Sequence, residues 1–205
     1  TDTLPYIPTY ADCEIPAETA YALGVFFADG TCGFRGETAC GAWWRIVGEK
    51  ELLEKAKAGL EAYPRFPVYF RLNLFNSYRK GTETNYGRRN RDEWCLDVYA
   101  KKYGARRDFI RAFYRMFYLD GILDYKKVPG CIYDSSLEAK KAFLQGVIDG
   151  DGDEYNRLTV VGDLALTGII KLMMDLHWAF SVCKDPRTKR DDVYCINYGT
   201  QREPR

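Results

Sequence analysis

Residues 143–152 read FLQGVIDGDG, and residues 21–30 read YALGVFFADG. The two stretches match at an offset of 122 residues, so that Asp29 corresponds to Asp151. Internal repetition of this kind indicates a duplicated architecture. Each copy has the pattern of an apolar helix that stops at an acid followed by glycine, a residue that adopts the left-handed conformation found at many helix ends.

Small residues lie one helical turn apart in each copy, Gly24 with Ala28 and Gly146 with Gly150. Residues four apart share one face of a helix, and a face of small residues lets two helix backbones approach closely. The two matching faces predict that these helices pack against each other and bring their C-terminal ends together.

The predicted packing places the carboxylates of Asp29 and Asp151 side by side. An acid at a helix C-terminus faces the negative end of the helix dipole, at a cost of roughly 0.3 kcal/mol or more, and two neighbouring carboxylates repel each other. A divalent cation between them would turn this repulsion into attraction. The pair therefore predicts a metal site. Simple helix termination is the alternative, but Asn or Gly would fill that role at lower cost.

A second repeat supports the duplication. Residues 46–49 (IVGE) correspond to residues 160–163 (VVGD) at an offset of 114, so the second unit is shorter than the first. We expect an αββαββα order in the first half, residues 1–128, and a reduced version of it in the second half, residues 129–205. The expected helices cover about 17–28, 49–63, 106–118, 137–149 and 163–179, and the expected strands cover 31–35, 43–47, 68–76, 93–99, 158–161, 181–184 and 193–197. Ser135 and Glu138 have the spacing of a capping box.

Residues 22–30 and 144–152 resemble the two copies of the LAGLIDADG motif of homing endonucleases. One copy alone is a weak signal, but two copies that each open a repeated unit form a specific one. Phe27 departs from the acid often found at the sixth letter of the motif, whereas Asp149 keeps it. The resemblance implies an α+β, pseudo-twofold fold in one compact molecule whose sheets form a DNA-binding saddle.

The same resemblance implies a site-specific, double-strand DNA endonuclease, a metal-dependent phosphodiester hydrolase of intron or intein homing that acts as a monomer. It implies that Asp29 and Asp151 are catalytic and bind Mg²⁺, with the carbonyl groups of Ala28 and Gly150 as further ligands. We expect Mn²⁺ to substitute for Mg²⁺ and Ca²⁺ to bind without supporting efficient cleavage. The alternative is a cleavage-deficient DNA- or RNA-binding protein on the same scaffold, such as an intron maturase or a transcription regulator. Such proteins tend to lose one or both motif acids, and both remain here.

The family often places a lysine near the scissile phosphates, in the connector before the second motif. Lys126 and Lys127 occupy that connector here and are followed by Val128 and Pro129. We expect Lys127 to support catalysis and Lys126 to contact DNA. An exposed linker lysine is the plainer alternative.

Residues 68–76 alternate in the manner of a half-buried strand, with polar and aromatic side chains on one face. The loop that follows mixes basic residues with tyrosines, a composition that suits contacts to phosphates and bases. The second unit has only a short basic turn at 185–192. Besides Lys126, the expected DNA-contacting residues are Arg71, Asn73, Arg79, Lys80, Arg88, Arg89, Arg91, Arg187, Lys189 and Arg190.

The net charge of +1 over 205 residues does not by itself indicate a nucleic-acid-binding protein, but the charge is segregated. Residues 71–127 hold fourteen Lys or Arg against seven acids, whereas residues 1–30 hold no Lys or Arg. The seven cysteines form no C-x-x-C pair, which indicates a reducing, intracellular compartment. No apolar run approaches the length of a membrane span, so we expect no membrane contact.

Overall fold

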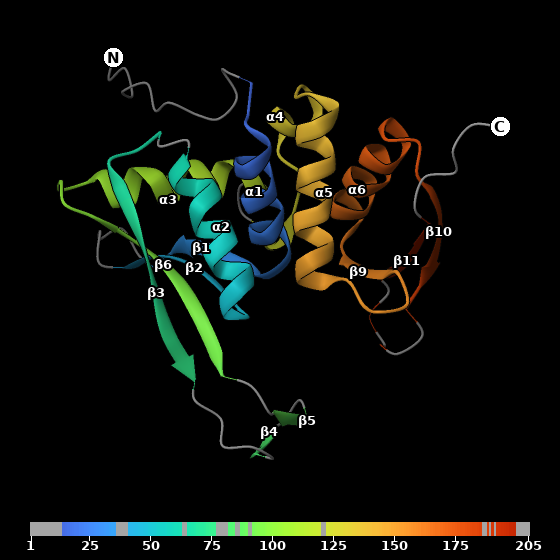
Figure 1. The fold of residues 1–205 in the computed structure, drawn as a ribbon, viewed down its shortest axis with the longest axis horizontal. Coiled ribbons are helices and arrows are strands. Elements are labelled where there is room, and N and C mark those ends of the chain that lie inside the picture. The colour runs from blue at the N-terminus through green and yellow to red at the C-terminus, as the bar shows by residue number, and fades with distance from the viewer. Residues whose placement is uncertain are drawn as a thin grey trace.

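The computed structural model describes residues 14–35, 41–62, 65–76, 82–84, 87–89, 92–119, 122–185, 188, 190 and 192–199. Figure 1 shows helices α1 (Ala17–Asp29) and α5 (Leu137–Asp151) side by side at the centre of the molecule, with one sheet on each flank. The two repeated units therefore meet along their motif helices, as the repeat predicts.

The first unit is an antiparallel, four-stranded sheet with the order β1-β2-β6-β3. Its strands are β1 (Gly30–Phe34), β2 (Ala42–Gly48), β3 (Val68–Asn76) and β6 (Glu93–Ala100), and its other helices are α2 (Lys50–Ala62) and α3 (Ala105–Phe117). The β3–β6 hairpin extends beyond the helices, and the short strands β4 (Thr82–Thr84) and β5 (Gly87–Arg89) pair past its end (Figure 1). The outer face of this sheet, opposite the buried side chains of Trp44, Leu96 and Val98, carries Arg45, Asn73 and Asp97.

The second unit repeats this plan with fewer elements. Its sheet has the order β10-β11-β9, and an isolated bridge between Gly152 and Leu158 stands where β1 pairs with β2 in the first unit. The strands are β9 (Arg157–Val161), β10 (Ala179–Lys184) and β11 (Val193–Gly199), and the helix is α6 (Asp163–Asp175). Within the described part of this unit, no helix corresponds to α3. The expectation of a reduced second unit is confirmed.

The connector between the units is a β-hairpin followed by one short helix. Strands β7 (Tyr118–Leu119) and β8 (Ile122–Lys126) pair with each other, and α4 (Gly130–Tyr133) leads into α5. This connector ends β8 at Lys126, next to the motif helices. None of the described helices is long and apolar enough to cross a membrane.

The glycines of the motif explain how closely α1 and α5 approach. A Cβ atom added at Gly24 would collide with the carbonyl oxygen of Phe143, and one added at Gly146 would collide with the carbonyl oxygen of Tyr21. The Tyr21 hydroxyl also donates to Asp149 Oδ2 at 2.7 Å across the pair. The small-residue faces therefore form the helix contact that the sequence predicts.

The glycines after the motif acids have a different role from the expected one. Gly30 and Gly152 have φ angles of −80° and −77°, so neither adopts the left-handed conformation. Each instead lies in tight contact with the last turn of its helix, because an added Cβ would come within 2.5 Å of the carbonyl oxygen of Phe26 or Ile148. Close packing, rather than backbone handedness, selects glycine here.

One apolar core joins the two units. The Phe26 ring stacks on Trp44 with centroids 5.3 Å apart and contacts Phe117 at 4.7 Å, so α1 is fixed to the first sheet and to α3. On the opposite side of α1, the rings of Phe27 and Phe143 lie 5.8 Å apart. Burial on both sides explains why α1 is apolar all round.

Two local predictions from the sequence are wrong. Helix α6 ends at Asp175, earlier than expected, because His177 takes a positive φ of 55° that turns the chain into β10. The N-cap of α5 is Ser136, whose hydroxyl accepts from the Ala139 N–H at 3.2 Å. Ser135, the expected cap, donates instead to the Cys131 carbonyl at 2.6 Å.

Candidate metal centre and DNA-binding face

Asp29 and Asp151 end the two motif helices on one side of the molecule. Both residues are exposed, and a Cβ added at Gly150 would lie 3.2 Å from Asp29 Oδ2, so the end of α5 reaches the Asp29 carboxylate. The C-terminal ends of α1 and α5 point toward the side to which the β3–β6 hairpin projects (Figure 1). The pair that the sequence predicts is therefore assembled and accessible.

The protein environment disfavours the charged form of both carboxylates. Protein atoms packed on one side of Asp29, together with the negative charge of Asp151, raise the pKa of Asp29 to about 7, while the charge of Lys126 acts in the opposite direction. Burial also raises the pKa of Asp151, and Lys126 again opposes the shift. The site thus concentrates negative charge that a cation would neutralise.

Lys126 is the lysine that the structure places at this pair. Its Nζ donates to the carbonyl oxygens of Phe26, Phe27 and Ala28 at 3.1, 2.8 and 3.1 Å. These carbonyls belong to the last turn of α1, where most backbone acceptors lack helical partners. The Phe26 carbonyl also accepts from the Gly30 N–H. Burial lowers the pKa of Lys126 to about 8, against the charges of Asp151 and Asp29, which act to raise it.

Lys127 is the next residue, and its contact is made by its backbone. Its N–H donates to the Phe117 carbonyl at 2.7 Å. The sequence favours Lys127, but the order of the two lysines along the connector does not reveal which one faces the helix ends. The Ala28 carbonyl, an expected metal ligand, accepts from Lys126 in this structure.

A cavity of about 330 Å³ lies beside Asp151, toward the second unit. Its polar lining includes Lys126, Thr159 and Arg190. Arg190 is held by Asp192, with Nε to Oδ1 at 3.0 Å and Nη2 to Oδ2 at 2.8 Å. One of the predicted DNA contacts, Arg190, therefore borders the same space as the motif acid.

Asp192 links that arginine to the connector. The Tyr125 hydroxyl donates to Asp192 Oδ2 at 3.0 Å, and Tyr125 precedes Lys126 in β8. The hydrogen bonds from Arg190 lower the pKa of Asp192 to about 2. The carboxylate thus keeps its charge at neutral pH. It connects Arg190 to Tyr125, the residue next to Lys126 in β8.

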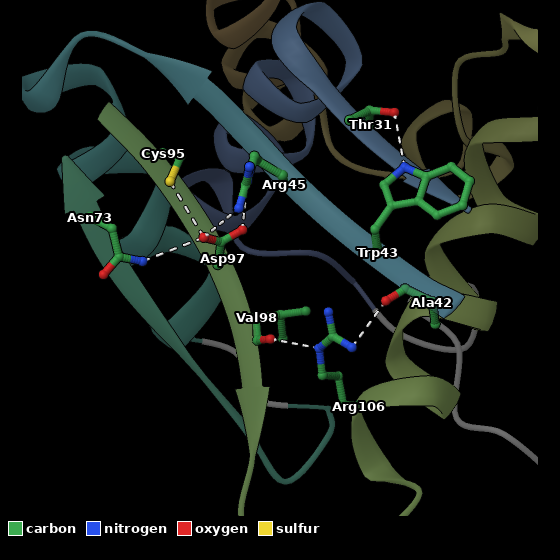
Figure 2. A network of polar contacts seen from close by, with 9 residues as sticks. All are labelled: Thr31, Ala42, Trp43, Arg45, Asn73, Cys95, Asp97, Val98 and Arg106. Carbon is green, nitrogen blue, oxygen red and sulfur yellow. Dashed lines mark hydrogen bonds and ion pairs between the residues drawn. The ribbon is translucent and has the colours of Figure 1, made fainter. Parts of the chain in front are cut away.

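The outer face of the first sheet carries a second group of polar residues. Arg71 and Asn73 alternate on β3 as predicted, and the Arg71 guanidinium lies 4.9 Å from the Tyr99 ring centroid and 5.3 Å from that of Tyr69. On the neighbouring strands, Arg45 and Asp97 form an ion pair at 2.8 Å. Figure 2 shows Arg45 and Asn73 converging on the Asp97 carboxylate from two sides.

Arg45 and Asp97 were not among the residues predicted from the sequence. Each is a charged residue on the outward side of an alternating strand, and this position could have marked both as candidate DNA-facing residues. Their pairing depends on the register of β2 with β6, which places Arg45 opposite Asp97. That register is a long-range property that no local pattern specifies.

Two of the remaining predicted contacts lie in the hairpin of β4 and β5. Arg88 and Arg89 belong to β5, where their backbones pair with Glu83 and Thr82 of β4. Five further predicted residues lie outside the described part of the chain: Arg79, Lys80, Arg91, Arg187 and Lys189.

The carboxylate pair suits a hard divalent cation. Mg²⁺ prefers oxygen ligands and is commonly held by one or two carboxylates together with substrate phosphates and water. Among the described residues, no group of three or more His, Cys, Asp or Glu side chains is placed to hold a metal ion. A cation at Asp29 and Asp151 would therefore complete its shell from other ligands.

Comparisons with known proteins identify the fold. No protein-family model matches the chain, and no curated protein matches its sequence. A structure of I-DmoI in complex with its target DNA, nicked in the coding strand and in the presence of Mn, is 15% identical, with a TM-score of 0.57 over 91% of this chain and 90% of that chain. I-DmoI in complex with DNA and Mn is 16% identical, with a TM-score of 0.52 over 89% of each chain.

A structure of mesophilic variants from the homing endonuclease I-DmoI gives the same result. It is 16% identical, with a TM-score of 0.53 over 91% of this chain and 85% of that chain. The similarity thus spans both units and both motif helices, rather than one half alone. The chain therefore has the fold of the LAGLIDADG homing endonucleases, in the single-chain form with two motifs.

Proposed function

We propose that this protein is a site-specific endonuclease that cleaves both strands of double-stranded DNA with a divalent metal ion. The observation that carries the proposal is the meeting of Asp29 and Asp151 at the ends of two close-packed helices, with Lys126 beside them. The structural neighbours were solved with DNA and Mn, which agrees with this chemistry for the shared fold.

Asp29 and Asp151 would hold the metal ion. When bound, a divalent cation supplies activation of water and neutralises charge on a phosphate. The two aspartates bind it in their ionised form. Burial raises the pKa of both, and the charge of Asp151 raises the pKa of Asp29 further, a repulsion that the cation would relieve. Mg²⁺ is the expected ion, Mn²⁺ the expected substitute, and Ca²⁺ the expected ion that binds without efficient cleavage.

Lys126 supports the reaction in this proposal, in place of the Lys127 that the sequence favoured. Its three carbonyl contacts fix Nζ at the end of α1, where its positive charge stabilises negative charge on a nearby phosphate oxygen. Arg190, at the border of the adjoining cavity, provides a second positive charge for the phosphate on the Asp151 side. Asp192 and Tyr125 position it.

Both aspartates come from one chain, so a monomer contains the complete pair. Each unit would lie on one half of the DNA site, since pseudo-twofold proteins mirror the symmetry of the duplex. The outer sheet faces, with Arg71 and Asn73 in the first unit, would contact base edges. The arginines of the β4–β5 hairpin would contact phosphates.

The test is cleavage of a randomised duplex library in Mg²⁺, with sequencing of the cut ends. The wild-type protein should yield one recurrent site cut on both strands. Asp29→Asn and Asp151→Asn should abolish cleavage and keep or increase DNA affinity, because each removes a negative charge near phosphates.

The matched control is Asp108→Asn, which makes the same substitution at a half-exposed acid of α3 that pairs with Arg111. This variant should cut like the wild type. Sequence-specific binding without any cutting by the wild type would instead favour a cleavage-deficient DNA-binding protein on this scaffold. Full cleavage by either motif variant would refute the assignment of the site.

A further inference from the structure

Asp97 is a carboxylate at the centre of a face that would meet DNA. Its side chain is only 15% exposed, and it lies on β6 between β2 and β3. Oδ1 accepts from Arg45 Nε at 2.8 Å, and Oδ2 accepts from Arg45 Nη2 at 3.1 Å. Oδ2 also accepts from the Asn73 amide at 3.4 Å and from the Cys95 thiol at 3.3 Å (Figure 2).

These contacts decide what Asp97 can do. A carboxylate has about four acceptor positions, and four donors from the chain already approach this one. Its negative charge also opposes any approach of phosphates. Asp97 therefore suits the positioning of other side chains better than the reading of a base.

Arg45 is held in one orientation by this carboxylate. The ion pair engages the Nε and Nη2 donors, and the guanidinium lies 5.1 Å from the centroid of the Phe75 ring on β3. The side chain remains 39% exposed, and Nη1 carries two further N–H donors. Arginine donors that are fixed in this way suit the two acceptors of guanine in the major groove.

Asn73 receives its orientation from the same group. Its amide nitrogen donates to Asp97 Oδ2, so the carboxylate joins one residue of β2 to one residue of β3 across β6. Asn presents a donor and an acceptor, a pattern that matches adenine. Arg71, on the same strand, is oriented differently, through the rings of Tyr69 and Tyr99.

We propose that Asp97 is a positioning residue that makes Arg45 and Asn73 one coupled base-reading unit, whereas Arg71 reads independently. The inference rests on the proposed function. It assigns part of the sequence discrimination in the first half-site to a partly buried acid that itself contacts no base. It predicts that the loss of the Asp97 charge lowers selectivity without lowering the overall affinity for DNA.

The experiment measures binding by selection from a partially randomised duplex library without Mg²⁺, so it does not depend on cleavage. Asp97→Asn should lower base preference by about tenfold at the positions read by Arg45 and Asn73, within the range of one bidentate base contact. Its affinity for unrelated duplex DNA should stay equal or rise, because a negative charge is removed. Asp108→Asn, with the same change of charge on α3, should keep the full base preference.

A second set of variants tests the coupling if Asp97→Asn folds poorly. Arg45→Ala should relax two positions, its own and that of Asn73, whereas Arg71→Ala should relax one. Unchanged base preference in Asp97→Asn, or relaxation of a single position in Arg45→Ala, would overturn the inference. A wild-type protein without sequence-selective binding would overturn the proposed function itself, which is a different result.

Discussion

The two sheets flank the same pair of helices but differ in how completely they are built. The first sheet has four strands, and its core face packs against α3 through contacts of Trp44 with Phe109 and Phe113. The second has three strands, and its edge strand β10 is largely exposed, with Val182 at 38%. Both units therefore contribute one motif helix to the central pair, but the second unit has fewer strands around it.

The outer faces of the two sheets also differ in the side chains that they carry at matching positions. Counted by the offset of the second repeat, Thr159 stands in β9 where Arg45 stands in β2, and it pairs with Cys195 where Arg45 pairs with Asp97. At these two positions, the second unit therefore has Thr159 and Cys195 in place of the charged pair of the first unit. We infer that the first unit contributes more to DNA discrimination. The proposed catalytic pair, Asp29 and Asp151, comes from both motif helices and should depend on both units equally.

The largest expected effect comes from the shared axis. Gly146→Leu should destabilise the whole protein by roughly 1–3 kcal/mol or more, because the added side chain would enter the space of the Tyr21 carbonyl. Both units should unfold together at a lower melting temperature in calorimetry. Gly130→Leu is the control, since an added Cβ there meets no atom within 4 Å. Equal melting temperatures for the two variants would mean that the motif helices do not pack as described.

A smaller effect should appear in the cleavage rate of only one of the two DNA strands. Arg190→Ala removes a positive charge from the cavity beside Asp151 only, so cutting of one strand should slow by about tenfold to a hundredfold, the range of one charged hydrogen bond. Nicked circular DNA should then accumulate in a plasmid time course. Arg111→Ala on α3 removes the same charge far from the cavity and should not cause accumulation. Equal slowing of both strands would contradict a role confined to one side.

The smallest effect should appear in the pH dependence of stability without metal. The pKa of Asp29 is raised to about 7, so the folded state binds this proton more tightly than the unfolded state does. The resulting stability is present below about pH 4 and is lost as the pH rises to about 7. Asp29→Asn should therefore melt a few degrees above the wild type at pH 8, with the gap closing toward pH 4. A constant gap over this range would show that the carboxylate is not perturbed.

The sequence predicts the parts of the molecule that repeat. The matched glycines predict the close contact of α1 and α5, and the matched acids predict the pair at their ends, because both follow from helical spacing. The alternation in residues 68–76 also predicts which side chains of β3 face outward. These features depend on neighbours within one helix turn or one strand.

The sequence does not predict features that depend on distant neighbours. The preference for Lys127 over Lys126 failed to identify the ammonium at the end of α1, because that contact joins residues about a hundred positions apart. The Arg45–Asp97 pair depends on strand register, and the glycines after the acids are selected by contact with the preceding turn. In each case the contact that determines the role of the residue is made with an atom that the spacing of the sequence does not reveal.

The most direct test of the central claim is Mn²⁺ binding, measured by electron paramagnetic resonance on the protein in complex with its already cleaved duplex. The wild type and Asp108→Asn should bind Mn²⁺ with the same affinity. Asp29→Asn and Asp151→Asn should each bind it at least about tenfold more weakly, because each removes one charged oxygen ligand. Equal Mn²⁺ affinity in all four proteins would contradict a metal site between the two motif aspartates.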